Sequence, residues 1–348
     1  MAGLVPKRTR RALRIAVAAI VVAAATGAVY EWIGERPDRE RLPQIGRSVD
    51  IGGRSLNIYC SGQGSPAVIF DSGAGESGFA WSHIQPRVAA LTQACWFDRA
   101  GYGWSDPGPF PHTSAAIAAD LHELLRREAI PRPYVMVGHS LGGLNIRVYN
   151  AMYPAEVAGA VLVDAAHEDE PRRAPKAMLG HTAPRFLWRP IWMAAEGARM
   201  VGITRLLLQR VALSDDPGQR TRDQIITALR AQPKTAATVA DPSMNESYAQ
   251  AERTGGFGNR PLVVLTRGRA PSHPPQTPAE RERAAYEQIW MHEIQPKLAR
   301  LSTRGTQIIV TKSGHYIPEE APESIVQAVR DVIGTVHRDA QHGSGIIR

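Results

Sequence analysis

The chain has 348 residues, of which 43% are hydrophobic and 6% aromatic. This is ordinary for a soluble globular protein with one large domain or two smaller ones. The formal net charge of +8 could indicate a nucleic-acid partner, but five of those charges lie in the first 14 residues, and the other arginines are interspersed with acids. The distribution favours a solvated surface over a polyanion-binding face, so we expect no nucleic-acid partner.

The N-terminus carries a targeting or membrane segment. Residues 1–14 form a basic flank, and residues 15–33 follow as a largely apolar stretch whose first charge is Glu31. The stretch approaches the ~20 residues of a membrane span, while small residues from Ala23 to Ala28 also permit cleavage as a signal peptide. A transmembrane anchor and a cleaved signal peptide are both open. In either case we expect the rest of the chain to be exported, either membrane-anchored on the extracytoplasmic side or secreted.

Residues 34–44 form a charged, proline-containing linker, and a folded domain is expected over residues 45–338. The domain begins with two strand-like runs around a Gly-Gly pair, which is a hairpin signal. Cys60 ends the second run, and Cys95 begins a later one. Because the chain is expected to be exported, two cysteines on neighbouring strands would favour a disulfide, and we predict a Cys60–Cys95 bond.

Short apolar runs rich in β-branched residues then alternate with segments of helical period. This alternation is typical of parallel strands covered by helices on both faces. The predicted strands are Arg47–Ile51, Arg54–Tyr59, Ala67–Phe70, Cys95–Phe97, Tyr134–Val137, Ala160–Val163, Leu262–Leu265 and Gln307–Val310, and the predicted helices include Thr113–Ala129, Leu141–Tyr153 and Ser324–Val336. The fold class is therefore α/β, with a mostly parallel sheet of eight strands and helices on both of its faces.

One interval lacks this alternation of strands and helices. Between Asp164 and Pro261 there is no convincing strand, and the apolar stretch Phe186–Met193 lies within it. We predict a helical lid at about residues 165–258 that covers the ends of the strands, in preference to a second independent domain. Residues 339–348 are predicted to form a C-terminal tail.

The run from Tyr134 to Gly143 contains a serine between glycines, which follows an apolar stretch and precedes a predicted helix. Ser140 stands in a G-x-S-x-G motif with Gly138 and Gly142, where glycine relieves collisions across a strained turn. Such a turn presents a serine as a nucleophile. With the elements that follow, the motif makes the domain resemble the α/β-hydrolase fold superfamily, and this resemblance implies the same eight-stranded sheet.

Two further loops carry the resemblance. The segment Phe70–Gly75 ends a strand and takes the place of the superfamily's His-Gly loop, with a Ser-Gly pair in that position. The resemblance implies an oxyanion hole made by the backbone amides of Ala74 and Leu141. A later loop that begins with Asp98 and Arg99 resembles the one after the fourth strand in many members, and we expect both residues to be structural.

The general base and its acid complete the predicted site. His315 follows the last strand in a Ser-Gly-His context and is the predicted base. Members usually place the acid after the penultimate strand, yet Pro261–Ala279 contains no Asp or Glu. Some relatives place it at the end of the preceding strand, where this chain has Asp164, and we predict Asp164 as the acid. Weaker alternatives are Glu168, Asp169 and Glu293.

The N-terminal segment predicts export, and the resemblance implies a serine hydrolase of the carboxylesterase or lipase type, with an acyl-enzyme on Ser140. No metal and no other cofactor are expected, since the histidines and carboxylates lack ligand spacing and there is no dinucleotide fingerprint. The expected partner is a small ester-like substrate, apolar if the Trp and Leu residues of the insertion line its pocket; they would equally serve to pack the lid. Alternatives are another triad hydrolase, such as a peptidase or carbon-carbon hydrolase, and a catalytically silent hydrolase-like binding domain.

Overall fold

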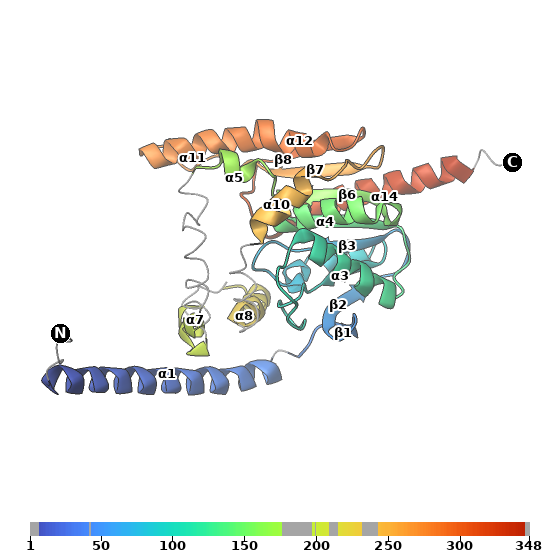
Figure 1. Ribbon diagram of the computed structural model, residues 1–348. Helices are drawn as coiled ribbons and strands as arrows, with labels where there is room; N and C mark the ends of the chain where they lie inside the picture. Colours follow the sequence, from blue (N-terminus) through green and yellow to red (C-terminus); the bar gives the residue numbers. More distant parts are fainter. Residues whose placement is uncertain are drawn as a thin grey trace. The chain divides into compact units, whose positions relative to one another are not determined.

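The computed structural model (Figure 1) describes residues 7–41, 43–175, 197–198, 200–208, 215–231 and 243–344. They fall into two units, one within Met1–Gln44 and Arg185–Ala240, the other within Ile45–Pro184 and Asp241–Arg348. The second unit holds the sheet and every predicted site residue.

Eight strands form one sheet in the order β1-β2-β4-β3-β5-β6-β7-β8. Strands β1 and β2 pair antiparallel, β2 and β4 also pair antiparallel, and all later pairs are parallel. The strands are β1 (Arg47–Asp50), β2 (Ser55–Ser61), β3 (Ala67–Asp71), β4 (Ala94–Phe97), β5 (Tyr134–His139), β6 (Val157–Val163), β7 (Leu262–Arg267) and β8 (Gly305–Val310). The predicted fold class is confirmed, because each predicted strand is present and the sheet is mostly parallel.

Helices cover both faces of the sheet. Ile69, Met136 and Leu162 lie in one buried cluster with Leu121 and Leu144, which belong to the helices of one face. Successive strand residues point to opposite faces, so their neighbours along each strand pack against the other layer. The helices of the first face are α3 (Ser114–Arg127), α4 (Leu141–Met152) and α10 (Met244–Glu252), and those of the second are α2 (Gln85–Ala89) and α14 (Pro322–Ser344). The last of these extends into the predicted C-terminal tail.

The predicted disulfide is present. Cys60 in β2 and Cys95 in β4 are direct partners in the antiparallel register, and their sulfur atoms are bonded. The covalent link therefore joins the antiparallel edge of the sheet to its parallel part.

The helices after β7 and β8 carry or support the site. They are α11 (Pro278–Ile289), the π-helical turn η3 (Trp290–Ile294), α12 (Gln295–Ala299) and α13 (Ile317–Glu320). A capping box at Thr277 begins α11: the Thr277 side chain accepts from the Glu280 amide, and Glu280 accepts from the Thr277 amide. This fixed start determines which residues of α11 face β7.

The described part of the predicted insertion is helical. It contains α5 (Glu170–Arg173) and α10 in the second unit, and α7 (Ile203–Leu208) and α8 (Pro217–Ala231) in the first. Phe186–Met193 lies outside the described residues. That the insertion covers the strand ends stays a prediction.

The first unit also contains α1 (Lys7–Arg41). Within it, residues Arg8–Gly34 form the one described helical stretch that is long and apolar enough to cross a membrane, with a mean hydropathy of 2.1. A signal sequence has the same properties.

Candidate active site

Ser140 alone makes the turn between β5, which ends at His139, and α4, which begins at Leu141. Its φ of 53° is strained for a residue with a side chain. A Cβ atom on Gly138 would lie 2.5 Å from the carbonyl oxygen of Gly142, so no side chain fits at this position of the motif. The local sequence therefore forces a sharp turn that exposes the serine hydroxyl.

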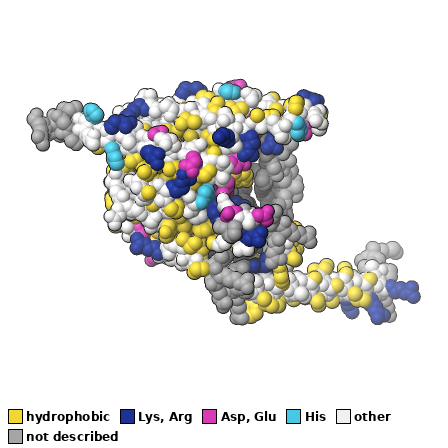
Figure 2. Space-filling model, turned by 180° about the vertical axis from the view of Figure 1, so that it is seen from behind, with side chains coloured by type: hydrophobic (Ala, Val, Ile, Leu, Met, Phe, Trp, Pro, Cys, Tyr) yellow, Lys and Arg dark blue, Asp and Glu magenta, His cyan; other side chains and the backbone are white. Residues whose placement is uncertain are grey.

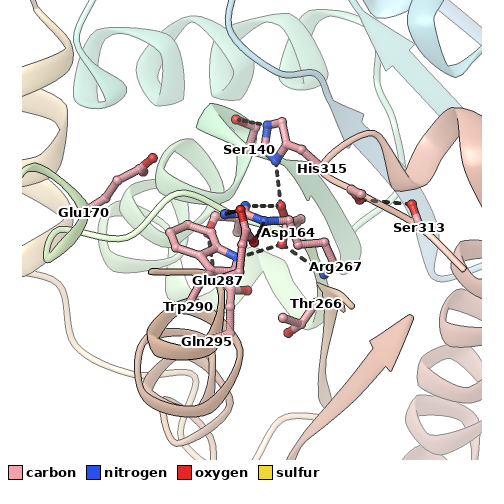
Figure 3. A network of polar contacts seen from close by, with 12 residues as sticks. Ser140, Asp164, Glu170, Thr266, Arg267, Glu287, Trp290, Gln295, Ser313 and His315 are labelled. Atoms are coloured by element: carbon pink, nitrogen blue, oxygen red, sulfur yellow. Dashed lines mark hydrogen bonds and ion pairs between the residues drawn. The ribbon is translucent and has the colours of Figure 1, made fainter. Parts of the chain in front are cut away.

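A chain of hydrogen bonds connects the three predicted catalytic residues (Figure 3). His315 Nε2 lies 3.2 Å from Ser140 Oγ, and His315 Nδ1 lies 2.6 Å from Asp164 Oδ2. A neutral imidazole that donates from Nδ1 to the carboxylate leaves its Nε2 lone pair facing the hydroxyl. The His315 side chain is 37% exposed and that of Asp164 is fully buried. A substrate can therefore reach these hydrogen bonds from the Ser140 side and not from the Asp164 side.

Asp164 is held by four donors. Its Oδ1 accepts from Trp290 Nε1 at 2.8 Å and from the Arg267 amide at 3.1 Å, and its Oδ2 accepts from His315 and from Arg267 Nη1 at 2.7 Å. Burial disfavours the ionised form, but the charge of Arg267 and the bond to His315 outweigh it and hold the pKa of Asp164 well below its usual range. The carboxylate is therefore ionised at neutral pH.

Asp164 also has an unusual backbone. Its φ is 38°, and among the described residues only Ala129, Ser140 and Asp164 combine a side chain with a positive φ. Two of these three are predicted catalytic residues, and strained backbone of this kind gathers at functional sites.

Arg267 and Trp290 were not predicted as site residues. Arg267 ends β7, at the position where the family usually has its acid, and its Nε donates to Glu287 at 2.6 Å. Its guanidinium also lies 4.4 Å from the centre of a Trp290 ring. The sequence carried a signal for Arg267, since a cation after a buried strand requires a carboxylate partner. Trp290 lies in a π-helical turn, which residue spacing does not reveal.

The loop that presents His315 is tied to α13. Glu320 accepts from the Gly314 amide at 2.6 Å and from the Ser313 hydroxyl at 2.9 Å, and it pairs with Arg269 at 2.7 Å. Buried His139 bonds through Nε2 to the His315 carbonyl at 3.0 Å. These contacts fix the backbone on both sides of the imidazole.

Arg99 clamps the predicted oxyanion loop. The buried guanidinium donates to Asp71 Oδ1 at 2.6 Å, to the Ser72 carbonyl at 2.5 Å and to the Gly73 carbonyl at 2.6 Å. This agrees with the structural role expected for Arg99. Ala74 follows in the clamped loop, and Leu141 is the first residue of α4, so its amide has no partner within the helix. Their role as an oxyanion hole stays a prediction.

The other carboxylates considered as acids have different partners. Glu168 pairs with Arg147 at 2.6 Å, Asp169 with Lys297 at 2.5 Å, and Glu293 with Arg173 at 2.7 Å. In the part of the chain that the structure describes, no cluster of three His, Cys, Asp or Glu side chains has the geometry of a metal site.

A cavity of about 1150 Å³ opens beside His315. Its wall includes Gly314 and His315, the end of β7 with the loop that follows, and α11. Arg267 and Glu287 line it together with Tyr286. Ser140, Ala74 and Leu141 are not among its lining residues, so the cavity lies on the His315 and Arg267 side of the candidate site.

A model of the alpha/beta hydrolase family matches residues 68–328, which is more than half of the chain. Among curated proteins, the one named "Probable transporter efuK" from Hormonema carpetanum is 31% identical over 135 residues, which are 36% of this chain and 19% of that protein. The chain spans less than half the length of the first curated relatives that it matches.

Solved structures share the fold. A thermophilic esterase from Thermogutta terrifontis has a TM-score of 0.55 at 20% identity, covering 84% of this chain and all of that one. The enol-lactonase from Burkholderia xenovorans LB400 has a TM-score of 0.56 at 18% identity, covering 83% and 100%. At these identities the likeness shows the fold alone.

Proposed function

This chain belongs to the alpha/beta hydrolase family, and from that premise we propose that it is an exported serine hydrolase that cleaves an ester-like bond through an acyl-enzyme. The observation that carries the proposal is the continuous hydrogen-bonded chain from Ser140 through His315 to Asp164. A silent binding domain has no need of an ionised, buried carboxylate aligned behind an imidazole. The proposed type is a carboxylesterase or lipase-like enzyme that uses no cofactor.

The geometry gives each residue a role. Ser140 Oγ attacks the carbonyl carbon of the substrate while His315 Nε2 takes the hydroxyl proton. The amides of Ala74 and Leu141 stabilise the oxyanion. The carbon–oxygen bond to the alcohol then breaks, and His315 returns the proton to the leaving alkoxide. Water attacks the acyl-enzyme by the same route, which releases the acid and restores Ser140. Asp164 orients His315 and stabilises its protonated form.

The ester assignment rests on analogy within the family. An esterase and a lactonase share the fold, and both names refer to cleavage of an ester bond. The same triad geometry would also serve a peptidase or a carbon-carbon hydrolase, and the fold does not choose among them. A substrate series that pairs each ester with its amide decides this point.

We also propose that α1 is retained as a membrane anchor. In the space-filling view α1 is a rod covered by hydrophobic side chains, with Lys and Arg gathered at its N-terminal end (Figure 2). Near its C-terminal end, Glu31 pairs with Arg205 at 3.0 Å, and both side chains are largely buried. A Cβ on Gly27 would lie 2.4 Å from the Val201 carbonyl oxygen. A segment that is cleaved after export has no need of such contacts.

The Cys60–Cys95 disulfide supports export. Disulfides persist in oxidising compartments and are rare in the cytosol. With the basic flank inside, the hydrolase unit would lie on the extracytoplasmic side. Extraction of membranes at alkaline pH should leave the full-length chain in the pellet, and protease added from outside should digest the hydrolase unit. A soluble product that lacks the residues up to about Ala28 would mean that the segment is a cleaved signal peptide.

A fluorophosphonate probe tests the nucleophile. We expect the wild-type chain to be labelled, Ser140→Ala to be unlabelled and His315→Ala to be labelled far more slowly. Ser272→Ala is the matched control, because Ser272 is an exposed serine on the cavity wall, and it should be labelled like the wild type. The catalytic proposal fails if the wild type is not labelled or if Ser140→Ala is labelled equally well.

A further inference from the structure

Arg267 connects two carboxylates. Its Nη1 donates to Asp164 at 2.7 Å, and its Nε donates to Glu287 at 2.6 Å. The side chain of Arg267 is 13% exposed and that of Glu287 is 28% exposed. The hydrogen-bonded chain of the active site therefore continues past the acid, from Asp164 to Arg267 and then to Glu287 (Figure 3).

Arg267 and His315 share one oxygen atom. Both donate to Asp164 Oδ2, His315 at 2.6 Å and Arg267 at 2.7 Å. When the imidazole gains a proton, it becomes a second cation on an oxygen that already holds one. A permanent positive charge at that place opposes the protonation of His315, while the negative charge of Glu287 favours it.

We infer that Arg267, fixed by Glu287, is a positioning residue that sets the lowest pH at which His315 can act as general base. This rests on the proposed function, because it requires His315 to be the base. It also explains why an arginine occupies the place of the usual acid: the site keeps its carboxylate at the end of β6 and adjusts that carboxylate from β7.

The sign of the effect follows from the charges. A base must be neutral in the free enzyme, so kcat/KM falls on the acid side as it gains a proton. Removal of the positive charge at Arg267 stabilises the protonated imidazole and moves this acid limb to higher pH. Removal of the negative charge at Glu287 leaves Arg267 less neutralised and moves the limb to lower pH.

Other titratable groups face the same residues from neighbouring elements. The His139 ring lies 4.8 Å from the His315 ring, and Glu76 lies 3.6 Å from His139. The remaining groups are Glu170 of α5, which accepts from Tyr248 of α10, Tyr286 of α11, Tyr316 beside His315, and Glu320 of α13. These groups are the same in all the variants below. They therefore cannot explain acid limbs that move in opposite directions in the Arg267 and Glu287 variants.

The test is the pH dependence of kcat/KM for a p-nitrophenyl ester in the full chain with Arg267→Gln, Arg267→Lys and Glu287→Gln. We expect the acid limb to move up by about 0.5–1 pH unit in Arg267→Gln and down by a similar amount in Glu287→Gln. Arg267→Lys keeps the charge, so its limb should stay near that of the wild type although kcat falls. Arg283→Gln is the matched control, since Arg283 lines the same cavity one turn before Glu287, and its limb should not move.

The outcomes separate this inference from the proposed function. If the fluorophosphonate probe labels Ser140 but Glu287→Gln leaves the limb in place or raises it, Arg267 has only a structural role. Equal shifts in Arg267→Lys and Arg267→Gln would also mean that the charge of Arg267 does not set the limb. If Arg267→Gln does not fold, the lysine and Glu287 variants still decide the question. Absence of probe labelling in the wild type refutes the proposed function itself.

Discussion

The sheet holds two buried arginine–aspartate pairs at the carboxyl ends of its strands, and they differ in what else each carboxylate binds. Asp71 pairs with Arg99 at 2.6 Å at the end of β3, and Asp164 pairs with Arg267 at 2.7 Å after β6. Both carboxylates are fully buried. The pairs are alike in chemistry and in distance.

Their other partners separate them. Asp71 also accepts from the Asn145 amide at 2.8 Å, and Arg99 also donates to backbone carbonyls, so every partner is fixed. Asp164 accepts from His315, a group that can gain and lose a proton and that reaches the serine hydroxyl. One titratable neighbour, His315, therefore distinguishes the pair in the candidate active site from the pair that only holds the fold together.

The largest expected effect distinguishes the two aspartates. Asp164→Asn keeps the shape of the side chain but removes the charge behind His315, and kcat should fall on the order of 10⁴-fold. Asp71→Asn should lower the free energy of unfolding but cost far less activity. Steady-state kinetics and chemical denaturation of both variants provide the test. Similar losses of kcat would show that the two pairs are not functionally different.

The next effect distinguishes the two arginines. Arg99→Met leaves Asp71 buried with a single amide donor, and we expect the free energy of unfolding to fall by about 3–5 kcal/mol. Arg267→Met should cost less stability, since Asp164 keeps bonds to His315, Trp290 and a backbone amide. Urea denaturation of both variants measures the difference. A greater loss in Arg267→Met would contradict this account.

The pH dependence of the free energy of unfolding distinguishes Asp164 from His167, a second buried titratable residue. Burial above all lowers the pKa of His167 to about 4 from 6.5, and its Nδ1 accepts from the Asp169 amide only when the ring is neutral. The unfolded chain therefore binds this proton more readily. Stability should be complete above pH 6.5 and fall by roughly 2–3 kcal/mol as the pH drops to 4.

The lowered pKa of Asp164 places its own loss at more acidic pH, below its ordinary value of 3.8. His167→Gln should therefore remove the decline between pH 6.5 and 4 and leave the later one unchanged. Denaturation midpoints at several pH values measure both. A decline that persists in His167→Gln would have to come from another group.

The smallest expected effect compares one neutral donor from each pair. Trp290 donates to Asp164 Oδ1 at 2.8 Å, and Asn145 donates to Asp71 Oδ2 at 2.8 Å. Trp290→Phe and Asn145→Leu should each lower the free energy of unfolding by about 1–2 kcal/mol. Only Trp290→Phe should also lower kcat, by a few-fold. Equal kinetic losses would mean that both carboxylates reach the reacting atoms.

Sequence was sufficient for the fold and for the three residues that the structure brings together. Ser140 and His315 stand in local motifs at strand ends, and parallel strands bring their carboxyl ends to one edge of the sheet. Asp164 could be chosen because Pro261–Ala279 contains no acid. These inferences required only chain order and strand periodicity.

The environment of the acid could not be predicted. Trp290 reaches Asp164 because a π-helical turn follows α11, and a turn of this kind has no residue spacing of its own. Glu287 faces Arg267 because of the point at which α11 begins. Pairing between side chains on different elements depends on packing, which a single sequence does not encode locally.

The pairing of Asp164, which follows β6, with Arg267, which ends β7, has an evolutionary consequence. A chain that gained an acid at position 267 before losing Asp164 would bury two carboxylates against one imidazole, which is strongly unfavourable. The opposite order would leave Arg267 with Glu287 as a carboxylate partner but would remove the carboxylate that His315 contacts. Asp164 and Arg267 should therefore be inherited as one unit, and a survey of relatives should find the two positions changing together or not at all.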